Sequence, residues 1–184
     1  MRIDAVSDGW VWTEGASCPA CGTYFVDDVD LWLLPDYVAL VKFQRPVGGA
    51  GAERAWLSLS FLSERTEPQD IKVHAFGSEV GGLAVQDLQA FLSRRDHPLG
   101  TLPVLEAAFG EEVFFDVSGF VGTAADPYLV FALSANNFAA LGSLEVNNGH
   151  GVQLLLAAVP EPSEAALMFA GLLTLAGWLR RRAA

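Results

Sequence analysis

Short apolar runs separated by turn residues dominate the first 158 positions of the chain. In Trp56–Phe61 the leucines and the final phenylalanine fall on one face of an extended chain, while Ser58 and Ser60 fall on the other. This period of two is typical of an antiparallel strand that is buried on one side. Residues 37–43 repeat the pattern, with Tyr37, Ala39, Val41 and Phe43 on one face.

Similar stretches recur along the chain, and one interval has a different period. Strands are expected at residues 9–13, 24–26, 31–34, 37–43, 56–61, 71–76, 113–117, 128–133, 144–146 and 152–156. Within 84–95, the apolar residues lie three and four positions apart, at Val85, Leu88, Phe91 and Leu92. That spacing predicts an amphipathic helix. The pattern predicts an all-β fold, an antiparallel β-sandwich of jelly-roll type, with one short helix near 84–95.

The last 26 residues have a third pattern. Pro160-Glu161-Pro162 precedes an apolar run over 165–179, which ends at Arg180, Arg181 and Arg182. A C-terminal apolar helix of these 15 residues would span about 22 Å, less than the roughly 30 Å of a bilayer core. The run is apolar on every face, which disfavours a helix packed on the domain, and the arginines form a membrane stop on the cytoplasmic side.

This three-part order resembles the PEP-CTERM sorting signal of exported bacterial proteins. The resemblance implies that an exosortase recognises Pro160, Glu161 and Pro162, cuts near them and removes the apolar tail. It further implies a Gram-negative bacterium that makes extracellular polysaccharide or biofilm matrix. The chain then divides into a β-sandwich domain over 1–158 and a sorting signal over 159–184, which inserts transiently into the inner membrane through 165–179.

Export normally requires a signal peptide, and residues 1–8 contain no apolar segment of the necessary length. The sorting signal therefore predicts that a signal peptide lies upstream of Met1. The alternative is a protein that is not exported and carries its tail as a relic.

The order of the strands carries a second resemblance. The segments 8–11, 39–43, 54–59, 115–121 and 128–133 are similar to successive strands of DNRLRE-type and carbohydrate-binding-module-like sandwiches of secreted bacterial proteins. The DNRLRE motif itself does not occur in the chain. This resemblance implies architecture more strongly than it implies a ligand, because a fold does not carry its function with it.

The charge of the domain restricts its partners. Residues 1–158 contain 8 basic and 20 acidic residues, a net charge of −12. Nucleic-acid binding is excluded, because such a domain offers no cationic surface to displace counterions from phosphates. Cations and neutral sugars, including an extracellular polysaccharide, remain as partners.

Two cysteines form the spacing Cys18-Pro19-Ala20-Cys21. We favour a local disulfide in an oxidising compartment, since redox catalysis needs the first cysteine at a helix N-terminus and a zinc site needs four ligands. Free thiols and a metal site are the alternatives.

Two further groups have a functional and a plainer interpretation. Asp27, Asp28 and Asp30 can hold a structural calcium ion through carboxylate oxygens, although a solvated turn is the commoner use of such a cluster. Trp10 and Trp12 share one face of a strand, where they form either a sugar-stacking platform or part of the core. The sequence indicates no other cofactor.

The histidines give no catalytic pattern. His74 is expected on the surface of a strand, while His97 and His150 lie in predicted loops, and no nucleophile motif accompanies them. We therefore expect a non-enzymatic protein of the cell envelope or extracellular matrix, sorted and cleaved by an exosortase, with a structural or adhesive role linked to exopolysaccharide. The alternatives are a carbohydrate-binding module and a tail-anchored membrane protein that is never cleaved.

Overall fold

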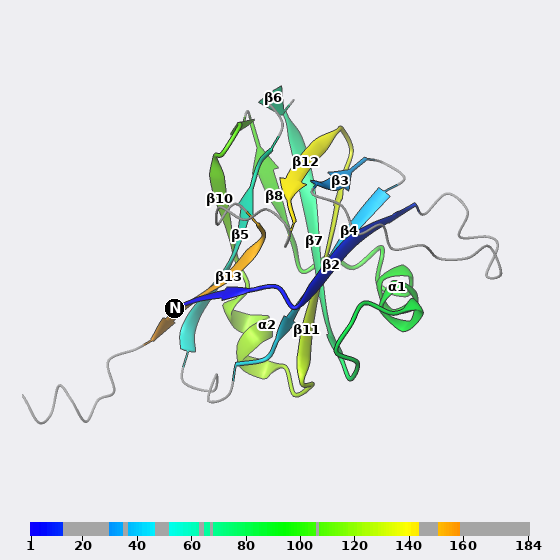
Figure 1. Ribbon diagram of the computed structural model, residues 1–184, viewed down its shortest axis with the longest axis vertical. Coiled ribbons are helices and arrows are strands. Elements are labelled where there is room, and N and C mark those ends of the chain that lie inside the picture. Colours follow the sequence, from blue (N-terminus) through cyan, green and yellow to red (C-terminus); the bar gives the residue numbers. More distant parts are fainter. Residues whose placement is uncertain are drawn as a thin grey trace, which may run out of the picture.

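Two antiparallel β-sheets form the body of the molecule (Figure 1). The computed structural model describes residues 1–12, 30–34, 37–46, 52–62, 65–66, 68–105, 107–143 and 151–158. The first sheet has the strand order β1 (Arg2–Asp4), β13 (Gln153–Ala158), β5 (Ala52–Ser60) and β10 (Glu112–Asp116). The second sheet has the order β2 (Ser7–Trp12), β4 (Tyr37–Gln44), β11 (Tyr128–Ala135), β7 (Gln69–Ser78) and β8 (Gly100–Val104).

Two small ribbons lie at the end of the molecule that is uppermost in Figure 1. One pairs β3 (Asp30–Leu33) with β12 (Ala139–Gly142), and the other pairs β6 (Arg65–Thr66) with β9 (Ala107–Ala108). Every strand pair of the two main sheets is antiparallel. The prediction of an all-β, antiparallel fold is confirmed.

The two sheets share one apolar core. Leu57 and Leu59 of β5 lie in it with the inward residues of β4, β7 and β11, and both leucines are fully buried, as the alternation predicted. Phe131 of β11 stands at its centre, with ring centroids 5.8 Å from Phe43 and 5.7 Å from Phe120 in edge-to-face arrangements. Fully burying a side chain of this size contributes roughly 1.5–3 kcal/mol, so packing between the sheets supplies most of the stability.

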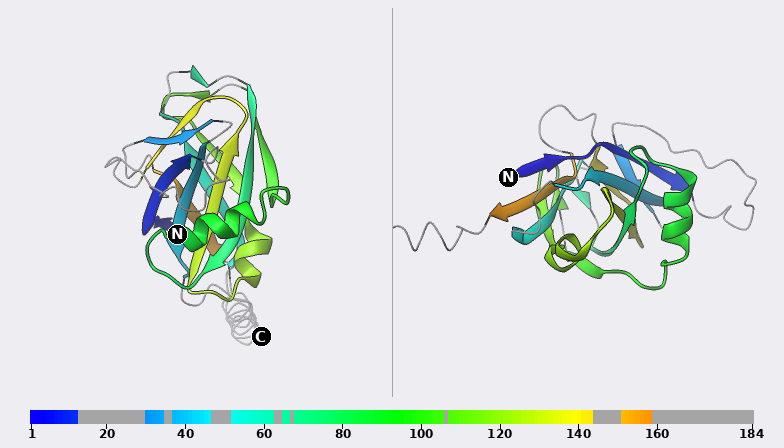
Figure 2. Two further views of the ribbon diagram at one scale, coloured as in Figure 1. Left: turned by 90° about the vertical axis from the view of Figure 1, so that its right-hand side faces the viewer. Right: turned by 90° about the horizontal axis from the view of Figure 1, so that it is seen from below.

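A second apolar cluster lies on the outer face of the second sheet, beneath α1 (Val85–Leu92). Figure 2 shows this helix crossing the sheet. Leu88 and Phe91 are buried there against Val38 and Leu40 of β4. The predicted amphipathic helix is confirmed. Because α1 covers the outer face and the first sheet covers the inner face, β4 has buried apolar residues on both sides. A strict alternation of apolar and polar residues would not predict this.

The outer face of the first sheet differs from expectation. Ser58 and Ser60 point away from the core as predicted, yet both are fully buried. The guanidinium of Arg2, on the edge strand β1, donates to Gln153 Oε1 at 2.9 Å and to Glu112 Oε1 at 3.1 Å. Since β1 and β10 are the two edges of this sheet, Arg2 links its two edge strands through the bond to Glu112.

A second helix, α2 (Ser118–Thr123), occupies part of the segment 115–121, which resembled a strand. That interpretation is wrong from residue 118 onward. The carboxylate of Asp116 accepts hydrogen bonds from the Ser118 amide at 2.8 Å and from its hydroxyl at 2.6 Å. A short acidic side chain that binds the backbone two residues ahead ends the strand and begins a turn.

Several predicted elements lie outside the described residues, namely the strands at 24–26 and 144–146 and the apolar helix at 165–179. Among the residues that the structure describes, no helix has the length and apolar character needed to cross a membrane.

Candidate functional site

Most residues that the sequence marked as functional lie outside the described part of the chain. This holds for the sorting motif, the terminal arginines, Cys18, Cys21, Asp27 and Asp28. For Asp30 and Trp12 the structure describes only the backbone, which belongs to β3 and β2 respectively. Within the described residues, no group of three or more histidine, cysteine, aspartate or glutamate side chains is arranged to hold a metal ion.

Trp10 is described in full, and its surroundings favour neither of its two interpretations alone. It is half-buried on β2 opposite Ala39, a core residue, so it faces the inner side of the second sheet at its edge. Its ring lies 5.0 Å from that of Tyr37, at an interplanar angle of 52°. Trp12 pairs with Tyr37 in register, which places both tryptophan positions on one face, as predicted.

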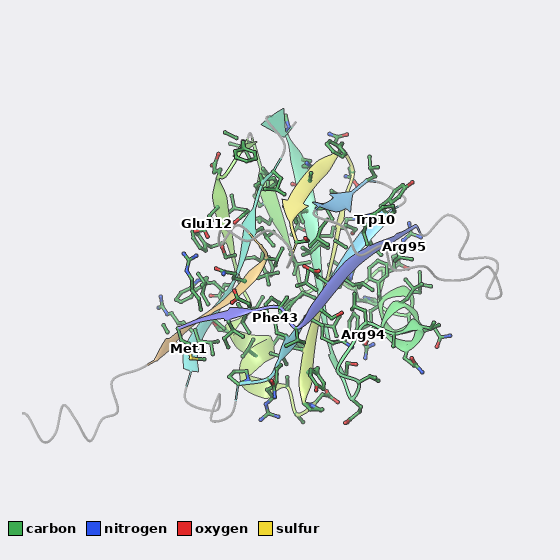
Figure 3. The ribbon with its side chains drawn as sticks, viewed as in Figure 1. Met1, Trp10, Phe43, Arg94, Arg95 and Glu112 are labelled. Atoms are coloured by element: carbon green, nitrogen blue, oxygen red, sulfur yellow. The ribbon has the colours of Figure 1, made fainter. Side chains whose placement is uncertain are left out.

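A pocket of about 120 Å³ adjoins this aromatic pair, with Tyr37 in its wall. We call it the α1 pocket. It lies between the end of the second sheet and the chain that follows α1. Figure 3 labels one residue of its wall, Arg95. The side chains that give it polar character are Lys72, Arg95, Asp96, Ser134 and Asn136, and its aromatic wall consists of Tyr37 and Phe91.

The strand register explains why these residues meet. Ser134 of β11 is the register partner of Lys72 on β7 and of Val38 on β4. All three positions alternate with core residues, so they belong to the outer face, which α1 covers. Arg95 and Asp96 follow the C-terminal end of α1, whose Phe91 is anchored in the apolar cluster beneath it.

The polar side chains of the α1 pocket are free to bind a ligand. Within the described part of the chain, no hydrogen bond or ion pair engages the side chains of Lys72, Arg95, Asp96 or Asn136. Arg45, by comparison, donates to the Ala125 carbonyl at 2.6 Å. Two cations against one carboxylate make the pocket locally positive in a chain of net charge −11.

His74 lies deeper on the same face, and its predicted surface position is wrong. Its side chain is buried, with 1% of the residue exposed, because α1 covers the face that alternation assigned to solvent. The ring packs edge-to-face on Phe91 with centroids 5.0 Å apart, and Nδ1 lies 3.2 Å from the Arg94 carbonyl oxygen. Within the described chain, Nε2 has no hydrogen-bond partner.

Burial lowers the pKa of His74 below its ordinary value, and the nearby positive charge of Lys72 lowers it further, against an opposing contribution from the Arg94 carbonyl. His97 lies in an exposed loop, as predicted, and His150 lies outside the described residues.

Sequence reasoning missed the α1 pocket because its residues come from β4, β7, β11 and the chain after α1. One signal was present. Arg94-Arg95 is the only pair of adjacent basic residues in the first 158 positions, and it stands directly after the predicted helix.

No protein-family model matches this chain, and no curated protein is significantly similar to it.

Proposed function

We propose that this protein is an exported, non-enzymatic component of the cell envelope or extracellular matrix of a Gram-negative bacterium. An exosortase sorts it and cleaves its tail, and its role is structural or adhesive and linked to exopolysaccharide. The observation that carries the proposal is the order Pro160-Glu161-Pro162, apolar run, arginine cluster. Its position supports the proposal too, since β13, which pairs with both β1 and β5, ends at Ala158, two residues before Pro160.

In finer detail, we propose that the domain is a jelly roll and that residues 165–179 form the apolar helix of the sorting signal. The strand orders support the jelly roll. Eight strands in two four-stranded sets, β1-β13-β5-β10 and β4-β11-β7-β8, follow the order expected of that architecture, with β2 added at the edge. The chain passes from one sheet to the other at nearly every connection among these strands.

Mass spectrometry of the protein recovered from its native host tests the sorting. We expect a mature C-terminus near Pro162, and we expect the variant Pro160→Ala/Pro162→Ala to keep its tail. Pro98→Ala, which changes a proline in an exposed loop, is the matched control and should be processed normally. An intact Arg182 in the mature protein would refute cleavage and favour the uncleaved, tail-anchored alternative.

The disulfide between Cys18 and Cys21 belongs to the same proposal, because export places the chain in an oxidising compartment. Alkylation of the unreduced, unfolded protein should modify neither cysteine, whereas alkylation after reduction should modify both. Modification without reduction would show free thiols.

A structural calcium ion at Asp27, Asp28 and Asp30 stays the lesser alternative to a solvated turn, and equilibrium dialysis against calcium tests it.

A second candidate function is carbohydrate binding, and one observation favours it. Tyr37, whose ring lies 5.0 Å from that of Trp10, lines a pocket in which the side chains of Lys72, Arg95, Asp96 and Asn136 are not used within the described chain. Flat aromatic rings stack on the apolar face of a sugar ring, and neighbouring polar side chains form hydrogen bonds with its hydroxyl groups. Binding to the host's own exopolysaccharide, lost in Trp10→Ala or Trp12→Ala, is the expected result. Failure to bind any glycan would exclude this function.

A further inference from the structure

We propose that the α1 pocket binds the carboxylate of an acidic sugar residue. This inference rests on the proposed link to exopolysaccharide and names the class of sugar involved. Its basis is the juxtaposition, around a single hollow, of two cations that pair with no other described residue, one carboxylate, two neutral polar side chains and an aromatic wall.

The volume of the pocket suits a group larger than water. Its space of about 120 Å³ is several times the roughly 10–15 Å³ that one ordered water molecule requires. Polar groups dominate its lining, so an apolar ligand would leave their hydrogen-bonding capacity unused at a cost in free energy. The occupant therefore carries several hydrogen-bonding groups.

The cations determine the charge of that occupant. Lys72 projects from a rigid central strand, and Arg95 follows a helix whose Phe91 is buried, so both positions are held by the fold. A carboxylate between them forms charge-assisted hydrogen bonds, which are roughly twice as strong as neutral ones. Arginine favours a carboxylate in particular, because its planar fork matches the two oxygens.

The remaining groups argue for a sugar and against a dense polyanion. Asp96 accepts hydrogen bonds from hydroxyl groups and repels a second anionic charge, while Ser134 and Asn136 both donate and accept. Tyr37, whose ring lies 5.0 Å from that of Trp10, forms part of the pocket wall. The rest of the chain is strongly acidic, so long-range repulsion disfavours phosphate-rich polymers, whereas one carboxylate inside the pocket interacts at short range.

The test compares charged and neutral forms of the same sugar on the full 184-residue chain. D-Glucuronate and D-glucose are titrated separately, and binding is measured by saturation-transfer NMR and calorimetry. We expect glucuronate to bind about tenfold more tightly than glucose, and Arg95→Ala or Lys72→Ala to abolish most of that difference. Arg54→Ala removes an equally exposed cation from the first sheet and should leave the difference unchanged.

The relative affinities for glucuronate and glucose distinguish three results that would overturn the proposal. Equal affinity for glucuronate and glucose would overturn the carboxylate assignment and leave a glycan-binding function in place. A preference for glucuronate that survives Arg95→Ala and Lys72→Ala in folded variants would place the site elsewhere and overturn the assignment to this pocket. Failure of both sugars to bind overturns the inference too, while the mature C-terminus tests the sorting proposal independently.

Discussion

The ammonium nitrogen of Lys42 lies 2.7 Å from Oδ2 of Asp87, and both side chains are almost completely removed from solvent. Lys42 points outward from β4, and Asp87 belongs to the first turn of α1. Lys42 Nζ also donates to Ser78 Oγ at 3.1 Å and to the carbonyls of Val80 and Gly82 at 2.9 and 2.6 Å. This cluster fastens α1, and the loop before it, to the second sheet.

The carboxylate of Asp87 has a second task. Oδ2 accepts a hydrogen bond from the Ala84 amide at 2.9 Å, at the start of the helix. Ala84 has no polar side chain of its own to cap the helix. The Asp87 carboxylate instead satisfies one of the backbone amides that a helix N-terminus leaves without a partner. The ion pair therefore acts both on the docking of α1 and on the beginning of the helix, and it supports Phe91 and the α1 pocket indirectly.

The first prediction concerns that pair. Lys42→Met should lower the free energy of unfolding by about 3–5 kcal/mol, because it leaves the Asp87 carboxylate buried without its partner. Lys42→Met/Asp87→Leu should recover a large part of the loss, since it removes both charges. Urea denaturation measures each variant.

The exposed ion pair between Arg2 and Glu112 is the matched control, with the arginine side chain 54% exposed. Arg2→Met should cost at most about 1 kcal/mol. A cost for Lys42→Met no larger than that for Arg2→Met would contradict a stabilising role for the buried pair.

The second prediction concerns His74 and acid. Because burial lowers its pKa in the folded protein, the unfolded chain takes up a proton that folded His74 does not bind. The contribution of neutral His74 is complete above the ordinary pKa of about 6.5 and is lost progressively as the pH falls below it. Stability should therefore decline as the pH falls from neutral through the ordinary histidine pKa of about 6.5, and His74→Phe should reduce that slope.

Urea denaturation at a series of pH values measures this effect. His97→Gln changes a histidine in an exposed loop and is expected to keep the slope of the unmodified protein. If His74→Phe and His97→Gln give the same profile, the decline in acid comes from other groups.

The third prediction concerns Gly77 on β7. A Cβ atom there would overlap the carboxyl group of Asp126, so the Asp126 side chain and its loop would have to move. Gly77→Ala should cost about 1–3 kcal/mol, the usual range for overpacking. Gly119→Ala in α2 meets open space and should be neutral or stabilising by about 0.5–1 kcal/mol, because alanine favours the helix. Thermal unfolding of the two variants should therefore shift in opposite directions, and a common shift would argue against the overlap.

The fourth prediction concerns the start of α2. The hydroxyl and amide of Ser118 hold the pKa of Asp116 below its ordinary value of 3.8, since both donate to its ionised form. The resulting stabilisation is present above that value and is lost as the pH falls through the lowered pKa. Carboxyl-carbon NMR should show the Asp116 pKa rising toward its ordinary value in Ser118→Ala, where the amide donor alone remains.

Thr123→Ala, at the other end of α2, removes a hydroxyl that donates to the Gly119 and Phe120 carbonyls and does not touch Asp116. The Asp116 pKa should be the same in this variant as in the unmodified protein. An unchanged pKa in Ser118→Ala would mean that the hydroxyl contributes little.

The sequence by itself determined most strands of the body and the position of α1, but it did not predict the strands β1 and β8. Alternation at Leu57 and Leu59, and at Ala39, Val41 and Phe43, identified the inward faces correctly, because a strand exposes successive side chains on opposite sides. The spacing of Leu88 and Phe91 identified α1 for the corresponding helical reason. These are local properties, and local rules predicted them. The sorting signal, too, is legible only in the sequence, as a pattern of residue types.

The tertiary structure alone decided what covers each outward face. Ser58 and His74 both alternate with core residues, and both are buried, one on the outer face of the first sheet and the other beneath α1. The pairing of Lys42 with Asp87 and the meeting of Lys72 with Arg95 likewise depend on which elements become neighbours. These residues are more than 20 positions apart in the chain, and the order of strands in the sheet brings them close together. Hydrophobic periodicity predicts individual strands and helices, but it does not predict that order.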